Sequence, residues 1–344
     1  MINDRNIIYI GDIVSNFHHA GNKARADVEK VFRKAFGQAY LILTGTSAKT
    51  LKYNFCYLIR YMTKFYSLLK QKSKIILIQY PFDVHPFLSV FLLILLKRHK
   101  FILLVHDIPE WRFPEIKRTL CSQVFLYNAE AVIVHNSKML ARIEGWDIEA
   151  KLINLEIFDY LRDSDEHPAR VFSHTVAFAG NLAKSTFLHE NLSNLFGKLY
   201  LYGPGEEHIQ FDDQIVYKGS FSPSEIPSKL EGSFGLIWDG ESIDTCSGNL
   251  GEYTKYNNPH KLSLYISSCL PVIVWSKAAI ADFVKKYNIG FCVDSLYEIE
   301  EKLSSMTDVD YEVYLHNLRD LQHKVINGYF TKQAIKSALE WCKS

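Results

Sequence analysis

The sequence predicts an α/β protein built from two doubly wound parallel-sheet domains. Three observations predict this fold class. Apolar runs of strand length alternate with helical periodicity, one charged segment without periodicity divides the series, and 344 residues with 48% hydrophobic side chains can bury two cores. We expect domains at residues 1–158 and 170–328, followed by a helix at 329–344 that packs back on the first domain.

The first half contains six apolar runs that have the length and composition of buried strands. They cover residues 6–13, 39–45, 74–81, 100–108, 130–136 and 151–157. After the first run, residues 21–36 place Ala24, Val28 and Phe32 on one helical face. The most apolar window, 86–96, is about half as long as a bilayer-spanning helix, so we expect a buried helix there.

A segment at 159–174 is charged, contains Pro168 and lacks periodicity, which favours a linker. The second half then repeats the alternation of strands and helices. The predicted strands cover residues 175–181, 198–204, 214–220, 233–240, 271–276 and 290–295. The predicted helices start at Glu225, Pro259, Ala278 and Tyr297, and the last forty residues have helical character.

Charge is distributed unevenly along the chain. Residues 1–157 hold 22 basic and 13 acidic side chains, whereas residues 158–344 hold 17 and 25. A basic first half favours an anionic partner, for which a membrane surface, a lipid diphosphate and nucleic acid are candidates. Scattered surface lysines are the alternative explanation.

Several function classes lack their motifs in this sequence. No GxGxxG follows the first strand, and neither GxxxxGK[ST] nor GxSxG occurs. The six cysteines lack metal-ligand spacing and suit a reducing cytoplasm. The DSD at 163–165 and the DVD at 308–310 do not follow buried strands, so we expect no metal. Met1–Arg5 runs directly into a strand, so we expect no secretory signal.

The stretch from Lys255 to Tyr265 predicts a helix with unusual charges at its start. Asn257 or Asn258 can cap it, and Pro259 suits its first position. Its first turn carries His260 and Lys261, where acidic side chains are expected. A bound diphosphate would make these charges complementary to the helix amides. We expect Asn258, at the same helix start, to belong to the nucleotide-sugar site together with His260 and Lys261. The alternative is a neutral His260 and a solvated Lys261.

Other strand ends in the second half carry polar or small residues, and ligands of parallel sheets bind at this edge. Gly180 and Gly203 allow close approach to the backbone, although such glycines also form ordinary turns. Asn181 and Lys184 can contact phosphate or ribose, and Tyr202 offers an aromatic face to a base. The long loop that follows another strand provides Asp239 as an acceptor for sugar hydroxyls, or simply as a solvated carboxylate.

The first half provides candidates for acid–base chemistry and for acceptor binding. Asp107 ends a buried strand and can act as a general base, with His106 as its orienting partner or substitute. A structural role for Asp107 is the alternative. Gly21, Asn22 and Lys23 begin a helix after the first strand and can bind an acceptor or a phosphate, or form an ordinary turn.

Residues 234–275 resemble the bacterial galactofuranosyltransferases that build O-antigen and capsule repeats. They resemble, more loosely, the glucosyltransferase that extends the first sugar on serine-rich adhesins. Short matches at 19–27, 106–108, 134–139, 157–161 and 179–182 extend the resemblance over most of the chain. It implies a GT-B architecture, in which two Rossmann-like domains face each other across a cleft. The second domain would bind the nucleotide sugar and the first the acceptor, without a metal.

The resemblance also implies roles for individual residues. Diphosphate contacts fall on His260 and Lys261, and uridine and ribose contacts fall on Asn181, Lys184 and Tyr202. The paired glutamates of larger GT-B families are absent, because the eighth residue after Glu252 is His260.

We therefore expect a cytoplasmic hexosyltransferase that uses a UDP-sugar, with galactofuranose as the first choice of sugar and glucose or another hexose as the alternative. Its acceptor would be a hydroxyl of a lipid-linked or protein-linked glycan. We expect no cofactor and no nucleic acid, while the basic half and the resemblance suggest peripheral membrane contact and a homo-oligomer. The competing hypotheses are a nucleotide-dependent, epimerase-like enzyme and an inactive, glycan-binding relative that acts as a scaffold.

Overall fold

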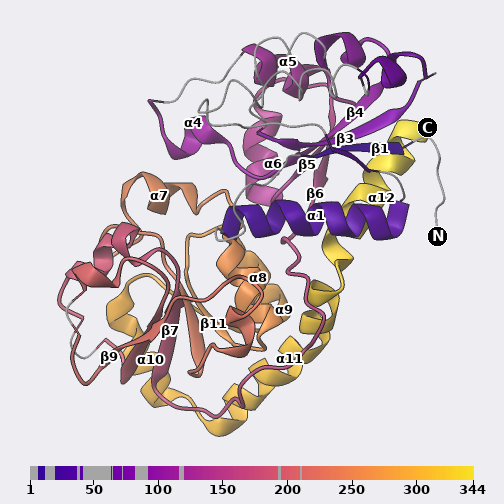
Figure 1. The fold of residues 1–344 in the computed structure, drawn as a ribbon. Coiled ribbons are helices and arrows are strands. Elements are labelled where there is room, and N and C mark those ends of the chain that lie inside the picture. Colours follow the sequence, from indigo (N-terminus) through magenta and orange to yellow (C-terminus); the bar gives the residue numbers. More distant parts are fainter. Residues whose placement is uncertain are drawn as a thin grey trace. The chain divides into compact units, whose positions relative to one another are not determined.

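The computed structural model describes residues 7–11, 20–36, 39–41, 63, 65–71, 73–81, 92–115, 120–192, 195–209 and 211–344. The chain divides into two compact units. Unit 1 takes its described residues from Met1–Asn16, Arg25–Leu155 and Thr331–Ser344, and unit 2 takes its own from Phe17–Ala24 and Glu156–Phe330. Each unit is a parallel sheet flanked by helices (Figure 1).

Unit 1 contains a six-stranded sheet in the order β2-β1-β3-β4-β5-β6, and all neighbouring strands are parallel. The strands are β1 (Ile7–Gly11), β2 (Ala39–Leu41), β3 (Ile75–Tyr80), β4 (Lys100–Val105), β5 (Ala131–Val134) and β6 (Lys151–Asn154). Each lies within a predicted apolar run. The buried residues of β3, β4 and β5 are mostly Ile, Leu and Val, as expected for a sheet covered on both sides.

The helices of unit 1 follow its strands in sequence. They are α1 (Ala20–Phe36, shared with unit 2), α4 (Pro109–Arg112), α5 (Leu120–Asn128), α6 (Ser137–Glu144) and α12 (Tyr329–Lys343, from Thr331). The Asn136 side chain caps α6 by accepting a hydrogen bond from the Met139 amide at 2.9 Å. Residues 92–96 are helical with Leu92 and Leu95 buried, while residues 86–91 of the predicted buried helix lie outside the described residues.

Unit 2 also contains a six-stranded parallel sheet, in the order β12-β11-β10-β7-β8-β9. Its strands are β7 (Thr175–Ala179), β8 (Lys198–Tyr202), β9 (Ile215–Gly219), β10 (Phe234–Ile237), β11 (Val272–Trp275) and β12 (Gly290–Val293). All six were predicted from the sequence. The fold class is therefore confirmed in both units.

The helices of unit 2 include short 3₁₀ turns and longer α-helices. The 3₁₀ turns are η1 (Leu182–Lys184), η2 (Thr186–His189), η3 (Glu206–His208), η4 (Ile226–Ser228) and η5 (Leu296–Glu298). The α-helices are α7 (Gly248–Tyr253), α8 (His260–Ser267), α9 (Ile280–Tyr287), α10 (Ile299–Ser305) and α11 (Asp308–Ile326). A capping box between Thr307 and Asp310 starts α11, which gives one acid of the DVD sequence a structural role.

Two predicted helix starts need correction. The helix expected from Glu225 is only the single turn η4, because Glu225 instead accepts hydrogen bonds from Ser222 and closes a turn. The helix expected from Pro259 begins at His260, and Pro259 is its N-cap. Asn258 does not cap it, since its side-chain amide donates to the Glu156 carbonyl oxygen at 2.9 Å.

The segment expected to be a linker is instead fixed to unit 2. The guanidinium of Arg162 donates to the Ser267 carbonyl oxygen at 2.5 Å. The guanidinium of Arg170 donates to the carbonyl oxygens of Ser268 and Leu230 at 2.7 and 2.8 Å. Both arginines thus bind carbonyl groups at the C-terminal end of α8, and Arg170 also binds one just after η4. Composition indicated a charged, irregular segment, but these contacts make it part of the domain.

In the part of the chain that the structure describes, no helix has both the length and the apolar character needed to cross a membrane.

Candidate functional site

The strand order of unit 2 identifies the edge where a ligand is expected. Strands β7 and β10 are neighbours, and the chain order runs in opposite directions on either side of them. In open parallel sheets this reversal leaves a crevice beyond the carboxyl ends of the two strands. Gly180 and Asn181 follow β7, and Asp239 follows β10 after one residue. Three predicted site residues therefore meet at the switch point.

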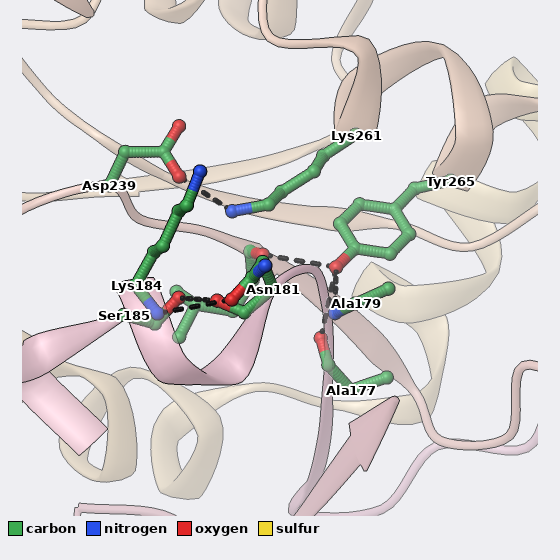
Figure 2. Close-up of polar contacts among 9 residues, drawn as sticks. Ala177, Ala179, Asn181, Lys184, Ser185, Asp239, Lys261 and Tyr265 are labelled. Carbon is green, nitrogen blue, oxygen red and sulfur yellow. Dashed lines mark hydrogen bonds and ion pairs between the residues drawn. The ribbon is translucent and has the colours of Figure 1, made fainter. Parts of the chain in front are cut away.

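Lys261, in the first turn of α8, points to this same place (Figure 2). Its Nζ lies 2.6 Å from Asp239 Oδ1 and 4.3 Å from the centre of the Phe178 ring. The pair is only partly exposed, at 17% for the lysine side chain and 29% for the aspartate. A Cβ at Gly180 would lie 3.1 Å from Lys261 Cε, so the absence of a side chain there leaves room for the lysine.

The N-terminus of α8 has the features of an anion site. Its first turn contains no acid, and within the described residues no side chain caps it. Backbone amides at a helix start point outward and carry partial positive charge. Lys261 adds a full charge, so the arrangement favours an anionic ligand with several oxygen atoms.

His260 does not supply the positive charge that the sequence suggested for the start of α8. Burial lowers the pKa of its imidazole to about 4, and the nearby Lys23 ammonium acts in the same direction. Its Nε2 lies 3.3 Å from the Asp159 carbonyl oxygen, and its ring stacks on Tyr160 with centroids 5.0 Å apart. At neutral pH His260 is therefore uncharged, and Lys261 is the charged side chain of this turn.

Gly180 and Gly203, at the ends of β7 and β8, pack closely against each other through their backbones. Gly203 has a φ of +127°, and a Cβ there would lie 1.8 Å from the Gly180 carbonyl oxygen. The packing of the two loops thus accounts for Gly203 without a ligand. Asn181 caps η1 by accepting a hydrogen bond from the Lys184 amide at 3.2 Å. Lys184 is exposed, and in Figure 2 its side chain extends from η1 in the direction of Asp239.

Two residues predicted to contact the nucleotide are buried and hydrogen bonded to backbone groups of the protein. Tyr202 is 1% exposed, its hydroxyl accepts a hydrogen bond from the Glu231 amide at 2.9 Å, and burial raises its pKa to about 12. Its ring therefore cannot offer a face to a base in this conformation. Asn258 is also buried and donates to the backbone of Glu156.

Sequence reasoning treated Tyr265 only as an apolar residue of the helix. In the structure it is fully buried, and its hydroxyl contacts the backbone of both β7 and β10 beneath the Lys261–Asp239 pair (Figure 2). The signal in the sequence is its position four residues after Lys261, on the same helical face.

In unit 1, His106 and Asp107 directly follow β4, as predicted. Asp107 Oδ2 accepts a hydrogen bond from Arg112 at 3.1 Å, whereas Oδ1 is buried and has no hydrogen-bond partner among the described residues. The His106 Nε2 atom is hydrogen bonded to Oε1 of the buried Gln79, whose amide nitrogen donates to the Tyr9 hydroxyl. This chain of contacts fixes the orientation of the imidazole beside Asp107.

The predicted acceptor residues at the start of α1 group with unit 2 and not with unit 1. Lys23 Nζ donates to the Leu161 carbonyl oxygen at 2.9 Å and lies 4.5 Å from the centre of the Tyr160 ring. Asn22 is half-buried, and Gly21 lies in the first turn of the helix. The ammonium of Lys23 thus holds two parts of unit 2 together in this conformation.

Comparison with known proteins adds the family. Residues 7–157 match the model of the Glucosyltransferase 3-like N-terminal domain, and residues 176–338 match that of the C-terminal domain. The chain is 35% identical to beta-1,6-galactofuranosyltransferase WbbI of Escherichia coli, over 72% of this chain and 74% of that protein. It is 28% identical to Glucosyltransferase 3 of Streptococcus gordonii, over 70% and 71%.

The fold also matches solved structures. Sucrose-phosphate synthase from Thermosynechococcus elongatus superposes with a TM-score of 0.66 at 10% sequence identity, covering 98% of this chain and 99% of that one. This likeness places both units in the GT-B fold.

Proposed function

We propose a specific reaction for this chain, which belongs to the Glucosyltransferase 3-like family and is a glycosyltransferase of the GT-B fold. The chain transfers galactofuranose from UDP-galactofuranose to a hydroxyl group of a lipid-linked or protein-linked glycan. The higher identity to the galactofuranosyltransferase, 35% against 28%, supports this sugar, and the glucosyltransferase relative supports glucose as the second candidate. The bond from the anomeric carbon to the diphosphate breaks, and a bond to the acceptor oxygen forms.

The departing diphosphate is stabilised at the start of α8. The helix amides and Lys261 provide positive charge where negative charge develops, and Lys184 adds a second cation from η1. Before the donor binds, Asp239 neutralises Lys261 at 2.6 Å. A diphosphate carries more negative charge than one carboxylate and also accepts hydrogen bonds from the helix amides. It therefore competes effectively with Asp239 for Lys261. The released Asp239 can then accept hydrogen bonds from sugar hydroxyls.

Asp107 is the proposed general base for an inverting transfer. Its Oδ1 has no hydrogen-bond partner among the described residues, so it can take the proton of the acceptor hydroxyl once a movement of the side chain exposes it. Arg112 holds the other oxygen, and Gln79 fixes the ring of the neighbouring His106. In this mechanism the charge of Lys261 takes the role that a metal ion has in other transferases.

The observation that carries the proposal is the position of Lys261 at the α8 N-terminus, above the β7–β10 switch point. The test is calorimetric titration with UDP in EDTA, comparing wild type with Lys261→Ala. Lys286→Ala is a matched control, because Lys286 also pairs with an acid, Glu156, at 2.9 Å in unit 2, but on the exposed surface of α9. We expect wild type and the control to bind UDP and Lys261→Ala to lose most of its affinity.

Three results would contradict parts of the proposal. Absence of UDP binding by the wild type would reject the donor nucleotide. UDP binding without transfer from UDP-galactofuranose, UDP-glucose or UDP-galactose to any glycan acceptor would favour the inactive, glycan-binding hypothesis. Loss of binding in EDTA that Mg²⁺ restores would reject metal independence.

Peripheral membrane association and a homo-oligomer are further proposals, supported by the excess of basic residues in the first half of the chain and by the resemblance described above. Sedimentation with anionic vesicles and light scattering of the purified protein test them directly.

A further inference from the structure

The hydroxyl group of Tyr265 lies between the two strands of the switch point. The pairing of β7 with β10 ends at Ala177 and Gly235. Just beyond it, the Tyr265 oxygen accepts a hydrogen bond from the Ala179 amide at 2.9 Å and donates to the Leu236 carbonyl oxygen at 3.1 Å. One side-chain hydroxyl thus satisfies a donor on one strand and an acceptor on the other, where backbone pairing has stopped.

The ring of Tyr265 is fixed as tightly as its hydroxyl. The residue is 0% exposed, and a Cβ at Gly235 would lie 2.5 Å from its ring carbons. A glycine in the interior of a strand often marks the close approach of another group, and here that group is the tyrosine ring. Burial raises the pKa of the phenol, so the hydroxyl keeps its proton and can donate.

Tyr265 and Lys261 lie one turn apart on the same face of α8. An anchor at Tyr265 therefore fixes the rotation of the helix and its position along its axis. Both quantities determine where Lys261 Nζ and the first amides of α8 point. In the structure they place the ammonium against Asp239, directly beyond the strand ends that Tyr265 bridges (Figure 2).

We propose that Tyr265 is a positioning residue for the donor diphosphate: its hydroxyl ties α8 to the carboxyl ends of β7 and β10 and so aims Lys261, one turn earlier in the helix. This inference rests on the proposed function, because it assigns the diphosphate to the same helix. Tyr265 itself does not touch the donor.

The test is a double-mutant cycle on UDP affinity, measured by calorimetry. Tyr265→Phe keeps the ring and removes the hydroxyl. We expect it to weaken UDP binding about five- to tenfold in the otherwise wild-type protein, and to change it little in the Lys261→Ala background, because its effect passes through Lys261. Steady-state kinetics should show a raised KM for the donor along with the weaker binding.

Tyr311→Phe is the matched control. Tyr311 is also a buried tyrosine of unit 2, and its hydroxyl donates to the Ser233 carbonyl oxygen at 2.9 Å, before the start of β10 and away from the switch point. We expect it to lower the melting temperature without weakening UDP binding. An equal loss of affinity in both tyrosine variants would mean that any lost buried hydroxyl has this effect, and would overturn the inference.

The remaining outcomes are distinguishable. Wild-type affinity in Tyr265→Phe, or full additivity with Lys261→Ala, overturns the positioning role and leaves the donor site standing. Failure of the wild type to bind UDP overturns both. If Tyr265→Phe does not fold, hydrogen exchange of the wild type decides. UDP should slow exchange of the Ala179 amide, whose acceptor is the Tyr265 hydroxyl, and unchanged exchange would reject the inference.

Discussion

Lys261 Nζ lies 2.6 Å from Asp239 Oδ1, so the cation of the proposed donor site already has a carboxylate partner in the unliganded protein. The donor must replace this partner. Asp239→Asn removes the competing charge, and we expect it to strengthen binding of UDP by up to about fivefold, since partly exposed ion pairs contribute up to about 1 kcal/mol. Transfer should nevertheless slow, because the carboxylate is no longer available to the sugar. Weaker binding of UDP by Asp239→Asn would contradict this exchange of partners.

Lys261→Ala should reduce kcat about 100-fold or more, because one preorganised charge at a developing anion contributes on the order of 3 kcal/mol. The melting temperature should change little, since Asp239 retains some solvent exposure after the lysine is lost. Stopped assays of sugar transfer, with Lys286→Ala run in parallel, measure the effect. Near-normal turnover by the Lys261 variant would remove it from the mechanism.

His260 makes stability depend on pH. Its pKa is lowered in the folded state to about 4, against an ordinary value near 6.5, so the unfolded chain binds more protons between these values. Its contribution to the free energy of unfolding is fully present above pH 6.5 and is lost as the pH falls toward 4. The loss should be about 1–3 kcal/mol.

The variant that tests this dependence is His260→Gln, which keeps a hydrogen-bonding side chain but cannot titrate. Urea unfolding at pH 7.0, 6.0 and 5.0 should show a shallower decline for the variant than for wild type. The buried His135, whose pKa burial also lowers to about 4, remains in both proteins and contributes the same slope to each. Parallel curves would show that His260 is solvated in the folded state.

Asp107→Asn should lower kcat by about 100-fold or more and leave UDP affinity unchanged, because the carboxylate acts on the acceptor and not on the donor. Wild-type turnover by the variant would assign Asp107 a structural role next to Arg112.

Gly203→Ala should destabilise the protein by about 2 kcal/mol or more. A Cβ there meets the Gly180 carbonyl oxygen at 1.8 Å, and the φ of +127° is unfavourable for alanine. Gly145→Ala is the control, because Gly145 has a φ of −67° and its Cβ would meet nothing closer than 3.4 Å. Similar melting temperatures for the two variants would mean that the loops after β7 and β8 can separate without cost.

The sequence predicted all twelve strands because buried parallel strands are read from short apolar runs. It also placed Lys261 and Asp239 at strand or helix ends of one sheet edge. The sequence alone does not determine the role of an aromatic residue at this sheet edge. Tyr202 and Tyr265 are both tyrosines in apolar patterns, and only tertiary packing shows that one hydroxyl serves the Glu231 amide and the other bridges the switch point. The prediction of a linker at 159–174 also missed tertiary packing, because Arg162 and Arg170 bind backbone carbonyl oxygens that are distant in the sequence.

The division of the chain also sets an order for its folding during synthesis. Unit 1 includes α12 from Thr331 onward, where the Cys342 carbonyl oxygen accepts a hydrogen bond from Lys100 Nζ at 2.7 Å and the Trp341 ring lies 5.4 Å from Lys151 Nζ. Residues 156–330 of unit 2 are synthesised before these residues, so unit 1 cannot gain its contacts with α12 until the sequence of unit 2 has been made.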